Sequence, residues 1–137
     1  MTYPCSPNTE IDGLPYLPRL IEKIRLHHRG ELHPELHDNL GKGMDHWTCQ
    51  YLGVTYQDLK QTVLSGASDA ETLRWARQNG TTRSPEETQW WIAYMRTRGY
   101  RDDLSEKLAL RKKEHPRTDR ADIQTFFDYL DADENRA

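Results

Sequence analysis

The chain has few cysteines and no spacing that would pair them. Among 137 residues only Cys5 and Cys49 are cysteines, and they lie far apart with no CxxC motif. Unpaired thiols are typical of a reducing compartment. No apolar run reaches the length of a membrane span, and the first residues lack the charged and apolar regions of a signal peptide. We therefore expect a cytoplasmic protein that makes no contact with membranes.

An excess of positive charge is also missing. Lys and Arg number 19 against 22 Asp and Glu, for a formal net charge of -3. Such a balance gives no general attraction to nucleic acid or to anionic lipid. GxSxG, P-loop and Rossmann motifs are absent as well, so the sequence names no catalytic residue.

Period-two alternation, the pattern of half-buried strands, is not sustained anywhere in the chain. The chain instead repeats a unit of capping residue, apolar stripe and terminal Gly or Pro, which is typical of short helices. We expect helices at 17–29, 44–52, 56–65, 69–79, 85–98, 104–115 and 123–131, with a long loop that contains at most one helical turn near 34–40. These stretches predict an all-α fold, an orthogonal bundle of about six to eight short helices with no significant sheet.

The first part of the chain differs from the rest. Its Pro and Gly residues and its lack of apolar periodicity predict an extended arm over 1–14. The remaining residues, 15–137, are enough for one modest core, so we expect a single helical domain there.

The stretch from Ser84 to Gly99 carries the strongest helix signal. Ser84 and Glu87 can form a capping box with Pro85 at the first helical position. The helix that follows carries Trp90, Trp91, Ile92, Tyr94 and Met95, which cover about half of its circumference. This width predicts a central helix with neighbours on more than one side.

The polar side of the first helix offers a candidate binding surface. Arg19, Lys23 and Leu26 follow one another at i, i+4 and i+7, opposite the apolar stripe. A Leu among charges can mark a second contact surface. Our leading hypothesis is a small, non-catalytic protein-interaction module that meets a protein partner there.

A metal site is the alternative from another functional class. His33 and His37 can share one helical face, and His46 and Cys49 are three residues apart on the next helix. Together these four residues could hold zinc, either structurally or in a metal-dependent enzyme. Their spacing matches no standard zinc motif, and solvated loop histidines are the competing interpretation.

Nucleic-acid binding is the second alternative. Arg111, Lys112 and Lys113 form a short basic run, but neighbouring acids such as Glu106 and Glu114 interrupt the surrounding positive charge. This interleaving favours an ordinary solvated face, so the sequence predicts at most a weak nucleic-acid binder.

Several of these stretches, in this order, resemble a bacterial family known as domain of unknown function 5069. The resemblance covers most of the chain after the arm and is carried by residues 17–25, 51–60, 68–75, 84–91, 98–103 and 125–134. It implies one compact domain of bacterial type and brings no activity, cofactor or site residue with it.

Overall fold

The computed structural model describes residues 1–136, and its regular secondary structure is mainly helical. In chain order it contains β1 (Glu10–Ile11), β2 (Leu14–Pro15), α1 (Leu17–His28), the 3-10 helix η1 (Pro34–Asn39), α2 (Met44–Leu52), α3 (Tyr56–Leu64), α4 (Asp69–Asn79), α5 (Pro85–Thr97), α6 (Ser105–Lys112) and α7 (Phe126–Asp133). Within this described part, the one sheet is the antiparallel pair β1–β2, with Ile11 opposite Leu14. The expected all-α bundle of short helices is confirmed.

Four α-helices begin at a capping side chain, whereas α6 begins after Leu104 without one and α7 begins at Phe126 rather than at residue 123. Ser68 and Ser84 each accept a hydrogen bond from the backbone N–H three residues on, and the Glu side chain at that position accepts one from the Ser N–H. Thr55 and Thr125 cap α3 and α7 through their hydroxyls. Side-chain caps satisfy amides that a helix start leaves unpaired, so local sequence decides these boundaries.

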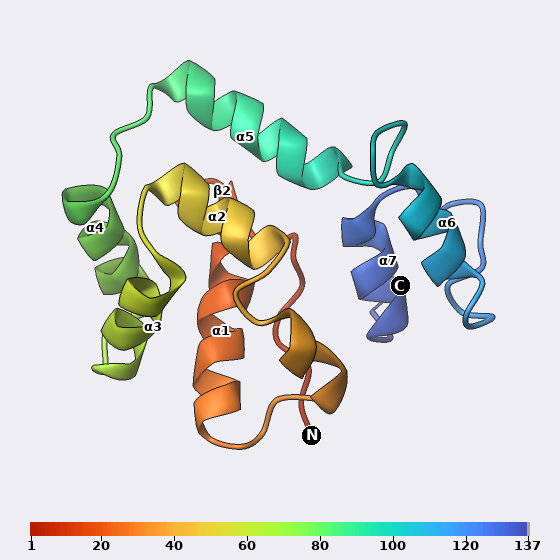
Figure 1. Cartoon of the computed structure of the whole chain (residues 1–137), viewed down its shortest axis with the longest axis horizontal. Coiled ribbons are helices and arrows are strands. Elements are labelled where there is room, and N and C mark those ends of the chain that lie inside the picture. Colours follow the sequence, from red (N-terminus) through yellow and green to blue (C-terminus); the bar gives the residue numbers. More distant parts are fainter. Residues whose placement is uncertain (137) are drawn as a thin grey trace.

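The helices are arranged around α1. Figure 1 shows α1 at the centre with α2 beside it, α3 and α4 on one side and α6 and α7 on the other. In the same view α5 runs along the edge of the molecule from α4 toward α6 and so joins the two sides. The N-terminal arm lies between α1 and α7, and Ser6 donates a hydrogen bond to Asp131 across that junction.

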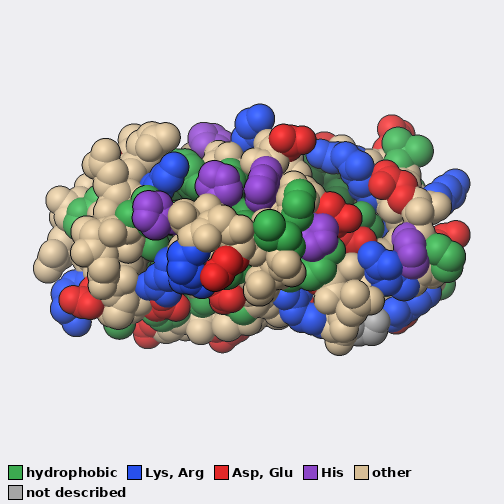
Figure 2. All heavy atoms as spheres, turned by 90° about the horizontal axis from the view of Figure 1, so that it is seen from below, with side chains coloured by type: hydrophobic (Ala, Val, Ile, Leu, Met, Phe, Trp, Pro, Cys, Tyr) green, Lys and Arg blue, Asp and Glu red, His purple; other side chains and the backbone are tan. Residues whose placement is uncertain are grey.

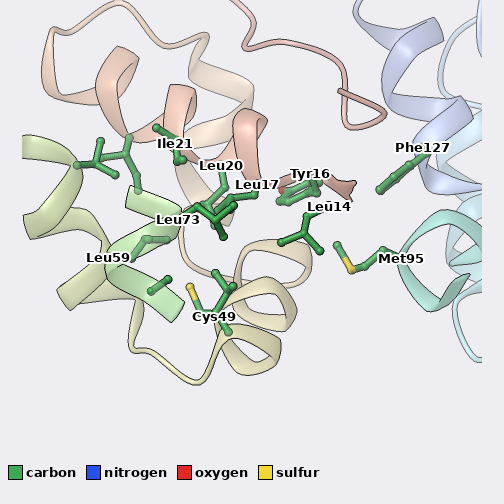
Figure 3. Packing of buried hydrophobic residues seen from close by; sticks show 14 residues of the cluster. Leu14, Tyr16, Leu17, Leu20, Ile21, Cys49, Leu59, Leu73, Met95 and Phe127 are labelled. Carbon is green, nitrogen blue, oxygen red and sulfur yellow. The ribbon is translucent and has the colours of Figure 1, made fainter. Parts of the chain in front are cut away.

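The core is continuous from α4 to α7. Leu17, Leu20 and Ile21 of α1 are at most 1% exposed and pack with the apolar faces of α2, α3 and α4. Figure 3 shows Leu14 and Tyr16 bridging from this group toward Met95 and Phe127. The rings of Tyr16 and Phe127 stack with centroids 6.2 Å apart. Residues just before α1 therefore connect the C-terminal helix to the core.

The expectation that α5 is a central helix was wrong. Of its residues only Met95 is buried, while Trp90 and Tyr94 are 64% and 43% exposed. One side of α5 packs on α2, β2 and α7, and the other side faces solvent. A broad aromatic stripe was interpreted as core, although Trp and Tyr also favour surfaces that bind other molecules.

A close backbone contact positions the segment before α5. The Thr81 N–H donates to the Leu52 carbonyl at 2.9 Å, where the ends of α2 and α4 meet. At Gly80 a Cβ atom would lie 1.9 Å from that Leu52 oxygen. Only glycine fits here, and the contact directs the chain from α4 across α2 and into α5.

No helix in the described part of the chain is both long and apolar enough to cross a membrane.

We predict that Gly80→Ala destabilises the protein by roughly 2 to 4 kcal/mol, because the new methyl group would force two backbone segments apart. Chemical unfolding midpoints at unchanged m-value measure the loss. Gly13→Ala is the matched control: Gly13 has φ +80°, and a Cβ atom there would have no neighbouring atom within 4 Å, so the change should cost only about 1 to 2 kcal/mol of left-handed strain. Equal losses at both positions would contradict the steric account.

Candidate functional site

The side of α1 that was expected to bind a partner is buried. Arg19, Lys23 and Leu26 are 1%, 3% and 3% exposed, so the expected exposed surface was wrong. A Leu26→Asp substitution would place a charge in the interior rather than remove a partner contact. The two cations are held by acidic residues far away in the sequence, which helical periodicity cannot reveal.

Arg19 pairs with Glu134 near the end of the chain. Its two terminal nitrogens donate to the two Glu134 oxygens at 2.8 and 2.6 Å, in a bidentate contact with both side chains 1% exposed. Arg19 also donates to the Cys5 carbonyl of the arm. Burial is the largest single influence and lowers the pKa of Arg19, but the hydrogen bonds to Glu134 and the nearby negative charges together outweigh it, so the net shift is upward.

Lys23 pairs with Asp45 of α2. The Lys23 ammonium lies 2.9 and 3.0 Å from the two carboxylate oxygens, and the Tyr16 hydroxyl donates to the same carboxylate at 2.6 Å. Burial lowers the pKa of Lys23, and burial together with the Asp45 charge raises the pKa of Tyr16. The polar side of α1 is thus an internal network and not a docking surface.

His33 and His37, the first half of the expected zinc site, lie at the start of η1 and within its last turn. The His33 ring stacks on Tyr3 at 4.3 Å, and its Nδ1 accepts the Glu35 N–H. His37 Nε2 lies 3.0 Å from the Leu32 carbonyl oxygen. Both imidazoles therefore have local partners that account for their positions.

His46 and Cys49 diverge from each other on α2. His46 is exposed, whereas Cys49 is 3% exposed in the hydrophobic core, where Figure 3 shows its sulfur among apolar side chains. Figure 2 shows imidazoles spread over one face of the molecule. Within residues 1–136 no group of three or more His, Cys, Asp or Glu side chains is placed to hold a metal ion. The structure does not bring His33, His37, His46 and Cys49 together, and zinc binding stays an untested prediction.

Two of the three basic residues at the end of α6 make contacts within the chain. Arg111 pairs with Glu114 at 3.2 Å, and the Lys112 ammonium donates to the Ile123 carbonyl at 2.7 Å. Lys113 is exposed. These contacts support the interpretation as a solvated face, and the nucleic-acid alternative stays an untested prediction.

A surface that the sequence did not single out lies between α2 and α5. It is an open depression of about 320 Å³, which we call the aromatic groove. Trp47, Gln50 and Tyr51 of α2 form one wall, and Glu87, Trp90, Trp91 and Tyr94 of α5 form the other, with Arg83 at the end near the start of α5. Each wall follows the i, i+3, i+4 spacing that places side chains on one face of a helix.

The walls of the groove are fixed by direct contacts between the two helices. The Tyr51 and Trp91 rings stack at 4.3 Å, and the Tyr51 hydroxyl lies 2.6 Å from the Thr88 hydroxyl. Trp47 and Tyr94 meet edge to face at 5.7 Å. Offset stacked and edge-on arrangements are the favourable geometries of ring pairs, so these side chains have little freedom to move.

A buried arginine contacts two of the rings that line the groove. The Arg98 guanidinium lies 4.8 Å from the Trp47 ring centre and 4.6 Å from that of Tyr94, and the residue is 6% exposed. It also donates to Asp102 and Asp103 at 3.1 and 2.8 Å. The hydrogen bond from Arg98 lowers the pKa of Asp103, which keeps that carboxylate ionised.

The groove offers ring faces and N–H donors, which are groups suited to binding a ligand. Its one carboxylate, on Glu87, already accepts the Ser84 N–H, and this hydrogen bond lowers the pKa of Glu87. A sequence signal was present in the Trp90–Trp91 pair with Tyr94. What the sequence could not show is that α5 lies at the edge, which leaves these rings exposed.

A family model matches the chain over almost its whole length. The model described as a domain of unknown function (DUF5069) matches residues 1–136, so the chain belongs to this family and the resemblance found in its sequence is confirmed. No curated protein matches the chain. The description of the family names no activity that could be transferred to the chain.

We predict that Arg19→Met and Glu134→Leu each cost about 3 to 5 kcal/mol, while the double variant costs less than the sum by about 2 kcal/mol or more. Each single change leaves a buried charge without its main partner, and the double change removes both. Chemical denaturation of the unchanged protein, the two single variants and the double variant gives the four unfolding free energies of this double-mutant cycle. The control is the Arg29–Glu31 pair, whose side-chain atoms lie 2.9 Å apart and whose side chains are each 53% exposed. Arg29→Met and Glu31→Leu should each lower the unfolding free energy by less than about 1 kcal/mol. Similar costs for the two pairs would contradict the buried network.

Both thiols should react slowly in the native protein. Burial, followed by the Asp45 charge, raises the pKa of Cys49 to about 12, and burial with the Glu22 charge raises that of Cys5 to about 11. The thiolate is the reactive form, so at about pH 8 both stay protonated and labelling should accelerate only as the pH approaches about 11, first at Cys5. Iodoacetamide labelling followed by mass spectrometry measures this, with guanidinium-unfolded protein as control. Fast labelling of Cys49 in the native protein near neutral pH would contradict its burial.

Proposed function

We propose that the protein is a non-catalytic interaction module that binds a partner protein through the aromatic groove. This keeps the function class that the sequence favoured and moves the contact surface from α1 to the α2–α5 face. The observation that carries the proposal is the exposure of Trp90 and Tyr94, at 64% and 43%, on the rim of a groove whose walls are also aromatic.

Exposed aromatic residues in one continuous surface call for an explanation that single exposed apolar residues do not. Trp and Tyr are enriched at protein interfaces, where they combine large apolar area with a polar atom and few rotatable bonds. Trp90 adds little to the core, because about two thirds of its surface remains in water. Packing within the chain therefore does not account for its presence.

The fixed walls of the groove support the same proposal. Trp91 is held by Tyr51, and Tyr94 is held between Trp47 and Arg98. A partner would meet a surface whose side chains are already in place, so little conformational entropy is lost on binding. We assign this interaction to the cytoplasm, which the free thiols of Cys5 and Cys49 support.

Trp90→Ala should leave the fold intact, because its side chain is mostly solvated. We predict a change in unfolding free energy within about 1 kcal/mol for Trp90→Ala, against about 2 to 3 kcal/mol for the half-buried Trp91→Ala. Thermal and chemical unfolding followed by circular dichroism compare the two variants. A large loss for Trp90→Ala would mean that this ring is structural and would contradict its assignment to a binding surface.

The proposal is tested with a photo-crosslinking amino acid placed at position 90 or 94 of the full chain in the source organism. Crosslinks should form to one discrete protein, identified by mass spectrometry. That protein, purified, should then bind the isolated chain and lose at least tenfold in affinity with Trp90→Ala.

Leu110 supplies the matched control, because it is 68% exposed on α6 and lies outside the groove. A crosslinker at position 110 should not capture the same partner, and Leu110→Ala should bind it normally. No specific crosslink from 90 or 94, or equal loss of binding in the Leu110 variant, would overturn the proposed function.

A further inference from the structure

A second depression lies beside the aromatic groove, at the point where the end of α2, the end of α4 and the start of α5 meet. It holds about 210 Å³ and is more enclosed than the groove. Tyr51 and Arg83 line both depressions. Besides these two, the polar side chains that line it are Arg77, Thr81, Thr82 and Thr88, and we call it the arginine pocket.

The shape of the arginine pocket is fixed by close backbone packing. The Thr81 N–H donates to the Leu52 carbonyl, and a Cβ atom at Gly53 would lie 2.3 Å from the Thr81 hydroxyl oxygen. The apolar side of the pocket consists of Leu14, Leu52 and Ala76, which are 3%, 5% and 1% exposed. The lining is therefore in place before a ligand arrives, which keeps the entropy cost of binding low.

The charged side chains that line the pocket are both arginines, and within residues 1–136 no Asp or Glu side chain lines it. Arg83 donates to the carbonyls of Tyr51 and Gln50 at 2.9 and 3.2 Å, so neutral oxygens hold its guanidinium in place. The Glu87 carboxylate lies 3.6 Å from Arg83, beyond hydrogen-bond distance. The pocket thus has a positive charge that is positioned and only partly compensated.

Arg77 is the second cation, and its partner is easily replaced. It pairs with Asp12, in the turn between β1 and β2, at 2.7 Å, but the two side chains are 54% and 65% exposed. An ion pair this exposed contributes little free energy, because water solvates both charges when they separate. An anion in the pocket can therefore take the place of Asp12 at little cost.

Hydroxyl groups complete the polar lining. Thr81 and Thr82 are exposed, and neither hydroxyl has a hydrogen-bond partner within residues 1–136. Thr88 belongs to the start of α5, the end of a helix at which the dipole favours negative charge. Each of these hydroxyls can donate to an oxygen that the two guanidinium groups attract.

We infer that the arginine pocket binds the phosphate group of a small phosphomonoester, a function that goes beyond the proposed protein interaction. The arginines and hydroxyls come from α4, from the segment between α4 and α5, and from α5 itself. A tetrahedral phosphate has three terminal oxygens that accept from several sides at once, and guanidinium groups match it in geometry. A carboxylate has two oxygens in one plane and would leave part of this lining unused.

The size and the apolar side of the pocket limit the rest of the ligand. Drug-sized ligands occupy pockets of about 300 to 1,000 Å³, and this pocket is smaller. Leu14, Leu52 and Ala76 can contact a few carbon atoms beside the phosphate, but their side chains offer them no hydrogen bond. The ligand is thus a phosphate ester with a small organic part.

The test titrates the full chain with glycerol 3-phosphate at constant ionic strength and follows the backbone amide resonances by NMR. The shifts should saturate and should include Thr82 and Arg83. Arg77→Gln should weaken binding about tenfold and Thr82→Val about fivefold, because each change removes a hydrogen bond to the phosphate. Arg74→Gln is the matched control, an exposed arginine of α4 outside the pocket, and should change the affinity less than about twofold.

Two further variants make the assignment specific. Asp12→Asn should strengthen binding about twofold, since Arg77 loses the carboxylate that competes with the ligand. Asn tolerates the positive φ of 49° at this position, so the turn should keep its shape. Trp90→Ala should leave the affinity for glycerol 3-phosphate unchanged, because Trp90 lines only the aromatic groove. Circular dichroism confirms that every variant is folded.

Several outcomes would overturn the phosphate pocket. They are the absence of saturable shifts, binding that Arg77→Gln and Thr82→Val leave unchanged, and acetate binding as tight as that of glycerol 3-phosphate. Loss of binding in Trp90→Ala would place the ligand in the aromatic groove and would equally contradict the inference. None of these outcomes depends on crosslinks from positions 90 and 94, so the proposed function stands or falls separately.

Discussion

The buried polar side of α1 determines how the two ends of the chain meet its centre. Arg19 holds Glu134 beyond α7 and the Cys5 carbonyl of the arm, while Lys23 holds Asp45 of α2. Each buried charge would be costly alone, so these residues tolerate few other arrangements of the arm, α2 and α7. The apolar stripe of the same helix packs against α3 and α4. With Arg19, Lys23 and Leu26 buried, the side of α1 that was expected to bind a partner has no exposed surface left for one.

The helices could be predicted from the sequence because the signals that define them are local. The packing of their polar faces could not, because it depends on residues far away in the sequence. Caps and terminal glycines act over three or four residues, and the predicted boundaries around Ser68 and Ser84 match the structure for that reason. The partners of Arg19 and Lys23 lie 115 and 22 residues away. Hydrophobic periodicity identifies the apolar face of a helix, and the opposite, polar face is then assumed to be exposed to solvent. That assumption is wrong wherever buried acids from elsewhere in the chain cover the cations.

The candidate site shows the opposite error. The aromatic residues of α5 were recognised, but their number was taken as a sign of burial on several sides. In the fold, α5 passes along the edge of the bundle, where Tyr51 and Arg98 fix the inner rings and Trp90 is left outside. Hydrophobicity does not distinguish an aromatic side chain that is buried in the core from one that is exposed on the surface. The distinction depends on the path of the chain, which the close contact of Gly80 with Leu52 directs.

Arg98 connects the architecture of the fold to the proposed binding surface. Its carbonyl accepts the Phe126 N–H at the start of α7, its guanidinium pairs with the aspartates that follow α5, and the same group lies against Trp47 and Tyr94. A cation placed over aromatic rings holds them more firmly as it is desolvated, and this one is almost fully buried. The residue that joins α5 to α7 thus also contacts two rings of the groove. Because the support of Tyr94 depends on this junction, the geometry of the groove depends on the docking of the C-terminal helix, which Arg19 and Glu134 secure from the opposite side.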